Sequence, residues 1–199
     1  MSGLAQITQT FAQQGYVVVR QLVPGAKVAQ LREHLERRAA GGELNMQGDV
    51  QVPGTPAAHG DATLDGLMED LRPAVEACTG LKLWPTYSYA RLYRHGDELK
   101  PHRDRPACEI SLSLNLGQEP ADQPWALNVE GSDGVGACML MPGDVLLYRG
   151  IELTHWRNAY DGQRLAQVFL HYVDQSGPHA GEKFDRRQYL GGPLVTQRP

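Results

Sequence analysis

The chain has 199 residues, of which 41% are hydrophobic, and its formal net charge is −4. This length supports one hydrophobic core, so we expect a single domain over residues 1–199. The small negative charge argues against nucleic acid as a partner. No apolar run approaches the roughly 18 residues that cross a bilayer, and the N-terminus does not resemble a secretory signal. Three widely spaced cysteines are typical of a reduced compartment, so we expect a cytoplasmic protein with no membrane partner.

The N-terminal part of the chain favours helices. Apolar residues recur at helical spacing in three places, and one β-branched run is typical of a strand. We predict helices over residues 4–13, over residues 26–38 and around residues 64–71, the last continuing past Pro73 or restarting there, and a strand over residues 16–19.

Residues 40–60 are rich in glycine and proline and contain few large apolar side chains. A connection of this length is either functional or disordered in a compact domain. We expect it to be a lid that is mobile without substrate and closes over the site when substrate binds.

From Leu81 onward the pattern changes to strands separated by turn signals. The predicted strands are 82–94, 109–116, 125–130, 137–141, 144–149 and 164–173. Helices followed by strands predict an α+β chain dominated by a β-sandwich or jelly-roll barrel. We divide it into helical support with the lid loop (1–80), a barrel core (81–175) and a C-terminal tail (176–199).

Two predicted strands have polar faces. Alternation puts Tyr87, Tyr89, Arg91 and Tyr93 on one side of their strand. Three tyrosines and an arginine make a poor solvent face, so we interpret this side as a cavity wall. The polar face that begins at Ser111 either meets solvent or lines the inside of a barrel.

The residues with the clearest chemistry are two histidines and an aspartate. His102 and Asp104 form an HxD triplet between two strands, and His155 follows after further strands. Two imidazoles and one carboxylate on one face of a metal bind ferrous iron and leave positions open for substrates. Arg164 lies beyond His155 at the start of a strand, and its planar guanidinium suits a carboxylate bound through two hydrogen bonds.

The segment from Tyr93 to Asp104 resembles the YxxGxxxxPHxD motif of prolyl-4-hydroxylase-like oxygenases that depend on Fe(II) and 2-oxoglutarate. The segment from Ile110 to Asn115 resembles the next strand of that group. The segment from Met141 to Tyr148 resembles its PxxGDAxxF strand, which leads to the second metal histidine. The resemblance covers roughly residues 84–175.

The resemblance implies a double-stranded β-helix (jelly-roll, cupin-like) with N-terminal supporting helices. It implies Fe(II) on His102, Asp104 and His155, with no catalytic side chain beyond these ligands. It also implies 2-oxoglutarate as cosubstrate, with Arg164 on its distal carboxylate and a hydroxyl from Tyr93.

We therefore expect a dioxygenase that uses dioxygen to hydroxylate or otherwise oxidise its substrate, releasing succinate and carbon dioxide. The substrate stays open among a small molecule, an amino acid and a peptide side chain, because the GGxTxF segment of prolyl hydroxylases is replaced here by the segment 124–129. Two alternatives use the same residues: a cupin-type metal-dependent hydrolase or isomerase, and a jelly-roll binding module without catalysis.

Overall fold

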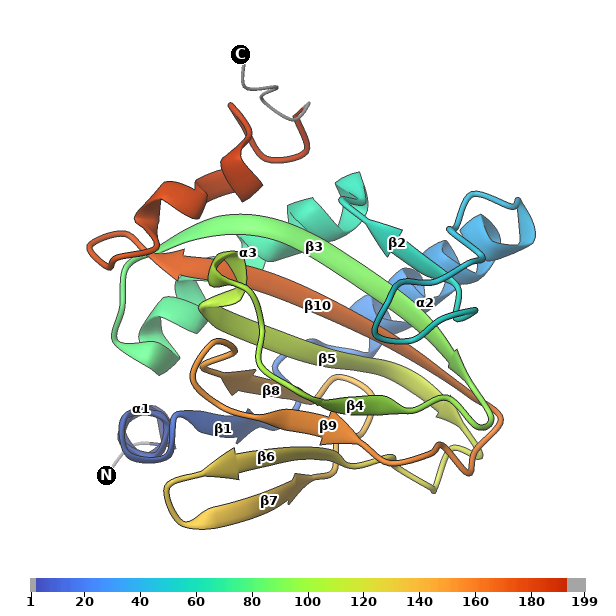
Figure 1. The fold of residues 1–199 in the computed structure, drawn as a ribbon, viewed down its shortest axis with the longest axis horizontal. Helices are drawn as coiled ribbons and strands as arrows, with labels where there is room; N and C mark the ends of the chain where they lie inside the picture. The colour runs from blue at the N-terminus through green and yellow to red at the C-terminus, as the bar shows by residue number, and fades with distance from the viewer. Residues whose placement is uncertain (1–2, 193–199) are drawn as a thin grey trace.

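The computed structural model describes residues 3–192, which form three layers (Figure 1). Helices cover the outer face of a six-stranded antiparallel sheet, and a four-stranded antiparallel sheet faces its other side. The predicted mixture of helices and antiparallel strands is therefore confirmed. Within these residues, no helix has the length and hydrophobicity to cross a membrane.

Three helices precede most of the sheet, as predicted. They are α1 (Gly3–Gln14), α2 (Gly25–Ala40) and α3 (Ala62–Thr79). The last helix continues through Pro73. Asp61 begins α3 by accepting hydrogen bonds from the backbone N–H groups of Thr63 and Leu64, which have no partner inside the helix.

The larger sheet has the strand order β1-β8-β5-β10-β3-β2. Its strands are β1 (Tyr16–Val19), β2 (Ala57–His59), β3 (Leu83–Arg94), β5 (Ile110–Glu119), β8 (Val145–Tyr148) and β10 (Arg164–Asp174). Five of these match predicted strands. The exception is β2, which falls inside the segment that we predicted to be loop throughout.

The smaller sheet has the strand order β4-β9-β6-β7. Its strands are β4 (Leu99–His102), β6 (Leu127–Gly131), β7 (Gly134–Cys138) and β9 (His155–Arg157). The sequence did not indicate β4 or β9, because each is too short to show an alternating pattern. The strand predicted over residues 137–141 lies earlier, as β7.

The two faces of the larger sheet differ in chemistry. Its outer face packs apolar side chains such as Leu114, Val168 and Leu170 against the helices. Its inner face, toward the smaller sheet, carries buried polar groups that include Ser111, Ser113 and Gln167. The polar face of β5 therefore lines the inside of the structure and does not meet solvent. A 3-10 segment, Ala180–Arg186, packs on β3 in the predicted tail, whose last residues lie outside the described part.

The turn before β8 is held by the buried carboxylate of Asp144. It accepts hydrogen bonds from the backbone N–H of Gln21 at 2.9 Å and of Met141 at 3.0 Å. It also forms an ion pair with Arg20 at 2.7 Å. Burial alone would raise the pKa of Asp144, but these hydrogen bonds outweigh it and lower the pKa. The carboxylate thus joins the end of β1 to the start of β8.

We predict that Asp144→Asn lowers the free energy of unfolding by about 1.5–3 kcal/mol near pH 7, the range for hydrogen bonds to charged groups. Because folding lowers the pKa of Asp144, its contribution is present above the unfolded pKa of about 4 and is lost as the pH falls through the folded value. Urea unfolding should therefore show the variant and the wild type converging in acid. Asp122→Asn, at an exposed position, is the control. An equal deficit for Asp144→Asn at every pH would contradict this role.

Candidate metal centre and cavity

Strand pairing brings the two predicted histidine ligands together. His102 ends β4 and His155 begins β9, and the two residues are partners in the antiparallel register. Their ring centroids lie 4.3 Å apart. Asp104 follows two residues after β4, where its backbone N–H donates to the carbonyl of Gly150 at 2.9 Å. The structure thus assembles the three residues that the HxD motif and His155 predicted.

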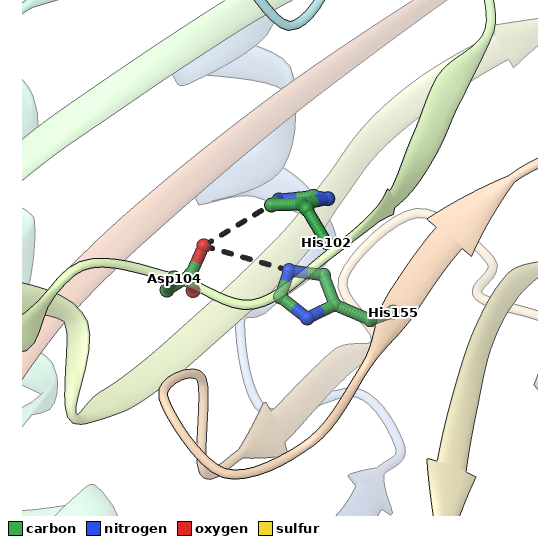
Figure 2. Close-up of side chains that lie close together, drawn as sticks. All are labelled: His102, Asp104 and His155. Carbon is green, nitrogen blue, oxygen red and sulfur yellow. Dashed lines mark ion pairs between the residues drawn. The ribbon is translucent and has the colours of Figure 1, made fainter.

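One carboxylate oxygen meets both imidazoles (Figure 2). The Oδ1 atom of Asp104 lies 3.6 Å from Nε2 of His102 and 3.5 Å from Nε2 of His155. The three donor atoms all lie within 4.8 Å of one another. Such a set is compatible with one shared cation.

Each ring is held in the tautomer that metal binding requires. The Nδ1 atom of His102 lies 2.9 Å from the carbonyl oxygen of Lys100, and Nδ1 of His155 lies 3.0 Å from that of Leu153. A carbonyl can only accept a hydrogen bond, so Nδ1 carries the proton in both rings. The lone pair of each Nε2 is therefore available toward Asp104, as in metal sites whose ligand histidines donate to an outer group.

The electrostatics of the cluster favour positive charge between these atoms. Burial alone would raise the pKa of Asp104, but its contacts with His102 and His155 outweigh burial and hold it well below the ordinary value. Burial alone would lower the pKa of His102, but Asp104 and the Lys100 carbonyl raise it overall. A divalent cation that takes all three donors at once would meet this demand.

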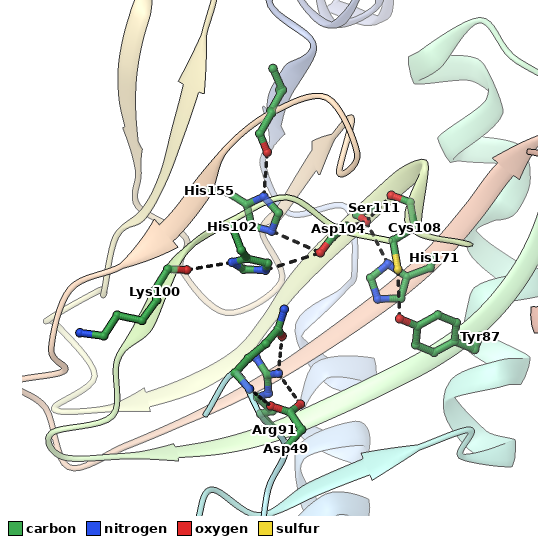
Figure 3. A network of polar contacts seen from close by, with 12 residues as sticks. Asp49, Tyr87, Arg91, Lys100, His102, Asp104, Cys108, Ser111, His155 and His171 are labelled. Carbon is green, nitrogen blue, oxygen red and sulfur yellow. Dashed lines mark hydrogen bonds and ion pairs between the residues drawn. The ribbon is translucent and has the colours of Figure 1, made fainter. Parts of the chain in front are cut away.

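The second oxygen of Asp104 is oriented by a buried network (Figure 3). The hydroxyl of Ser111 donates to Oδ2 of Asp104 at 3.1 Å and lies 2.9 Å from Nδ1 of His171. Burial lowers the pKa of His171 to about 4, so its ring is neutral near pH 7. Cys108 is also buried here, 3.0 Å from the hydroxyl of Tyr87. These groups support the orientation of the carboxylate.

The cluster opens into a cavity of about 500 Å³ between the two sheets. Tyr87, Tyr89 and Arg91 of β3 line it together with the three predicted ligands. The interpretation of the tyrosine face as a cavity wall is therefore confirmed for these three residues. The predicted lid segment reaches the same cavity through residues 49–51.

Two arginines are buried near this cavity. Arg91 is 4% exposed and Arg157 is 1% exposed. Arg157 donates to the backbone carbonyl of Trp125 at 2.5 Å and to the side chain of Gln167 at 3.2 Å. Its Nε has no hydrogen-bond partner, and no acidic side chain in residues 3–192 forms an ion pair with it. A buried cation without a counter-ion is costly, so the position is suited to an anionic ligand.

The structure does not bring Arg164 to this site. The side chain is exposed at the start of β10 and lines a second cavity with residues of α2. Alternation along β10 is the reason: Leu165, Gln167, Phe169 and His171 share the inner face, and Arg164 lies on the opposite one. Tyr93 does lie inside, fully buried, and its hydroxyl accepts a hydrogen bond from Arg91 at 3.1 Å.

Reasoning from the sequence missed Arg157 and His171 as parts of the interior. Arg157 follows two residues after His155, a spacing that puts both on one face of a strand. That signal was available, but β9 was not recognised as a strand. Alternation along β10 puts His171 on the opposite face from Arg164, and the structure shows that this face lines the cavity.

No protein-family model and no curated protein matches the sequence. Solved structures do match the fold. A Pseudomonas putida prolyl-4-hydroxylase has a TM-score of 0.68 at 21% identity, over 86% of this chain and 98% of its own. The epimerase SnoN, in complex with Fe3+, alpha ketoglutarate and nogalamycin RO, has a TM-score of 0.73 at 15% identity, over 99% and 97%. HygX from Streptomyces hygroscopicus, with nickel and 2-oxoglutarate bound, has a TM-score of 0.65 at 16% identity, over 86% and 87%.

This chain has the fold of these proteins. The resemblance that we inferred from the motifs is therefore confirmed for the fold.

A glycine next to the cluster provides a test of its geometry. A Cβ added at Gly150 would overlap Oδ2 of Asp104 and the Cys108 carbonyl, and would lie 2.9 Å from the Ser111 hydroxyl. We predict that Gly150→Ala moves Asp104 and weakens Co(II) or Fe(II) binding at least about ten-fold, the loss expected for disturbed outer contacts. Anaerobic calorimetry measures the metal affinity of the variant and of the wild type. Gly66→Ala is the matched control, because its Cβ would meet nothing within 4 Å. Unchanged metal affinity in Gly150→Ala would show that the position of Asp104 does not determine binding.

Proposed function

We propose that this protein is an oxygenase that depends on Fe(II) and 2-oxoglutarate, with the iron held by His102, Asp104 and His155. The observation that carries the proposal is the convergence of two tautomer-locked Nε2 atoms on one carboxylate oxygen at the wall of a cavity. The fold is shared with structures that hold iron or nickel together with 2-oxoglutarate.

We also propose that the core is a double-stranded β-helix. From β3 to β10 the chain passes between the two sheets, and only β6 and β7 follow each other in the same sheet. This strand order supports two interleaved four-stranded sheets, as in a jelly-roll. In that arrangement the ends of β4 and β9 present their ligands at one opening of the barrel.

The donor set fits ferrous iron. Two neutral imidazoles and one carboxylate form a facial set that leaves metal positions open for cosubstrate and dioxygen. The iron, 2-oxoglutarate and dioxygen supply the oxidising chemistry, which releases succinate and carbon dioxide as the substrate is hydroxylated or otherwise oxidised. The chain supplies fixed ligand orientation through Lys100, Leu153 and Ser111.

For the distal carboxylate of 2-oxoglutarate we propose Arg157 in place of Arg164. Arg157 is on the same strand face as His155, about 6–7 Å farther along β9 from the usual strand rise. Its unpartnered Nε and its lack of an acidic neighbour leave its charge available. Tyr93 lies between Arg91 and Arg157 and stays our candidate for the hydroxyl that binds 2-oxoglutarate. A buried pair of this kind is strong because the guanidinium is already desolvated.

We predict that replacing His102, Asp104 or His155 with Ala abolishes stoichiometric Fe(II) binding and succinate release. His95→Ala is the control, because His95 lies in the same motif but is exposed and outside the cavity. Anaerobic metal titration and succinate assays give the two readouts. Iron binding that survives in all three variants would overturn the ligand assignment. Iron binding without 2-oxoglutarate turnover in the wild type would support a cupin-type hydrolase or a binding module.

A second prediction compares the two arginines. Arg157→Gln should raise the KM for 2-oxoglutarate on the order of 30-fold or more, since losing one partner of a buried charge pair costs about 2–5 kcal/mol. Arg164→Gln should leave it unchanged. The wild type should also discriminate against 2-oxopentanoate, which lacks the distal carboxylate, and Arg157→Gln should lose that discrimination. Thermal unfolding confirms that the variants fold. The opposite ranking of the two arginines would restore Arg164 to this role.

A further inference from the structure

Arg91 is a buried cation in the wall of the cavity. Its side chain is 5% exposed. The guanidinium lies 5.2 Å from the ring centroid of Tyr89 and 5.8 Å from those of Tyr93 and Phe169. Aromatic faces compensate only part of the cost of removing this charge from water. An anion at this position lowers the remaining cost.

The anion comes from the loop that we predicted as a lid. The Oδ2 atom of Asp49 accepts a hydrogen bond from Nη2 of Arg91 at 2.5 Å (Figure 3). It also accepts one from the hydroxyl of Tyr89 at 2.6 Å. The side-chain oxygen of Gln51 accepts from the same Nη2 at 2.7 Å. The loop thus inserts one carboxylate into a binding site built by β3.

Asp49 is much less buried than the arginine that it neutralises. Its side chain is 31% exposed, and the next residue, Val50, is 97% exposed. Asp49 and Val50 both line the cavity that contains the proposed iron ligands. The carboxylate therefore comes from the outer, solvent-facing part of the loop, while its receptor belongs to the rigid sheet.

We propose that Asp49 occupies the receptor for a carboxylate of the primary substrate, which is a small organic acid. This inference rests on the proposed function, because it assigns the substrate of the same site. The substrate carboxylate would replace Asp49 on Arg91 and Tyr89, with its apolar part against the aromatic wall formed by Tyr87 and Phe169. Exchange of one carboxylate for another keeps the buried guanidinium paired.

The same contacts couple binding to movement of the loop. If Asp49 left without a replacement, Arg91 would stay buried and unpaired, which is strongly unfavourable. An entering carboxylate removes that penalty, so the loop is released when an anionic substrate arrives. This order is the reverse of the closure on substrate binding that we expected from the sequence. A neutral analogue of the same shape cannot release it.

The test uses the metal-free full-length protein in EDTA, with phenylacetate and phenylacetamide as probes and calorimetry as readout. The wild type should bind phenylacetate at least ten-fold more tightly than the amide. Asp49→Asn removes the internal competitor and should tighten phenylacetate binding at least ten-fold. Arg91→Gln should abolish the preference for the acid. The exposed pair on α2 provides matched controls, Glu33→Gln and Arg37→Gln, which should behave as the wild type.

Asp49→Asn decides the proposal even if Arg91→Gln fails to fold, because Asp49 lies in the loop. Equal binding of acid and amide, no binding of phenylacetate to Asp49→Asn at millimolar concentration, or no tightening in that variant would overturn the receptor. Since no metal is present, these results do not depend on turnover. A second arm compares organic acids with their amides for succinate release by the Fe(II)-loaded enzyme. Stimulation by amides alone would overturn the substrate class while leaving the oxygenase assignment intact.

Discussion

The convergence of two imidazoles on one carboxylate oxygen is the constraint on which the rest of the site depends. It requires that β4 and β9 pair in the register that sets His102 opposite His155. It also requires a backbone without a side chain at Gly150, where Asp104 passes close to the chain. The two carbonyls that hold the rings come from Lys100, within β4, and from Leu153, just before β9. Sheet register, turn geometry and ring tautomer therefore together determine how the two Nε2 atoms meet the carboxylate of Asp104.

The interior between the sheets contrasts with the core beneath the helices. Under the helices, a large cluster of apolar side chains is buried and contributes to stability by removing surface from water. Between the sheets, the protein buries two arginines, several tyrosine hydroxyls and the side chains of Ser111 and Gln167. These groups are expensive to bury, and they are arranged so that hydrogen bonds offset most of the cost. The Nε atom of Arg157 has no hydrogen-bond partner, and Arg157 is the residue that we propose for the distal carboxylate of 2-oxoglutarate.

The two buried arginines differ in their acidic partners, and this difference fits two different ligands. Arg157 has no acidic partner in the described residues, whereas Arg91 has one that a loop supplies. In our proposals, Arg157 binds the distal carboxylate of 2-oxoglutarate, and Arg91 binds a substrate carboxylate in exchange for Asp49. Arg91 lines the cavity together with the proposed iron ligands, whereas Arg157 is buried behind its wall.

The sequence by itself indicated the class of fold and the three residues that we propose as iron ligands. Hydrophobic periodicity is a local property, and it was enough to locate three helices and most of the long strands. The HxD triplet and the later histidine are short patterns whose chemistry is specific. The same holds for the tyrosine face of β3, since alternation is visible within one strand.

Only the tertiary structure decided which cations face the cavity. β4 and β9 are three or four residues long and owe their conformation to pairing with neighbouring strands, so no local pattern revealed them. Without β9, the face of Arg157 was undefined, and Arg164 looked like the natural partner for a carboxylate. A single step along a strand reverses the direction of a side chain. The sheet that β10 joins therefore had to be known before Arg164 could be placed outside, and Arg91 could be paired with Asp49 only once the loop was folded onto β3.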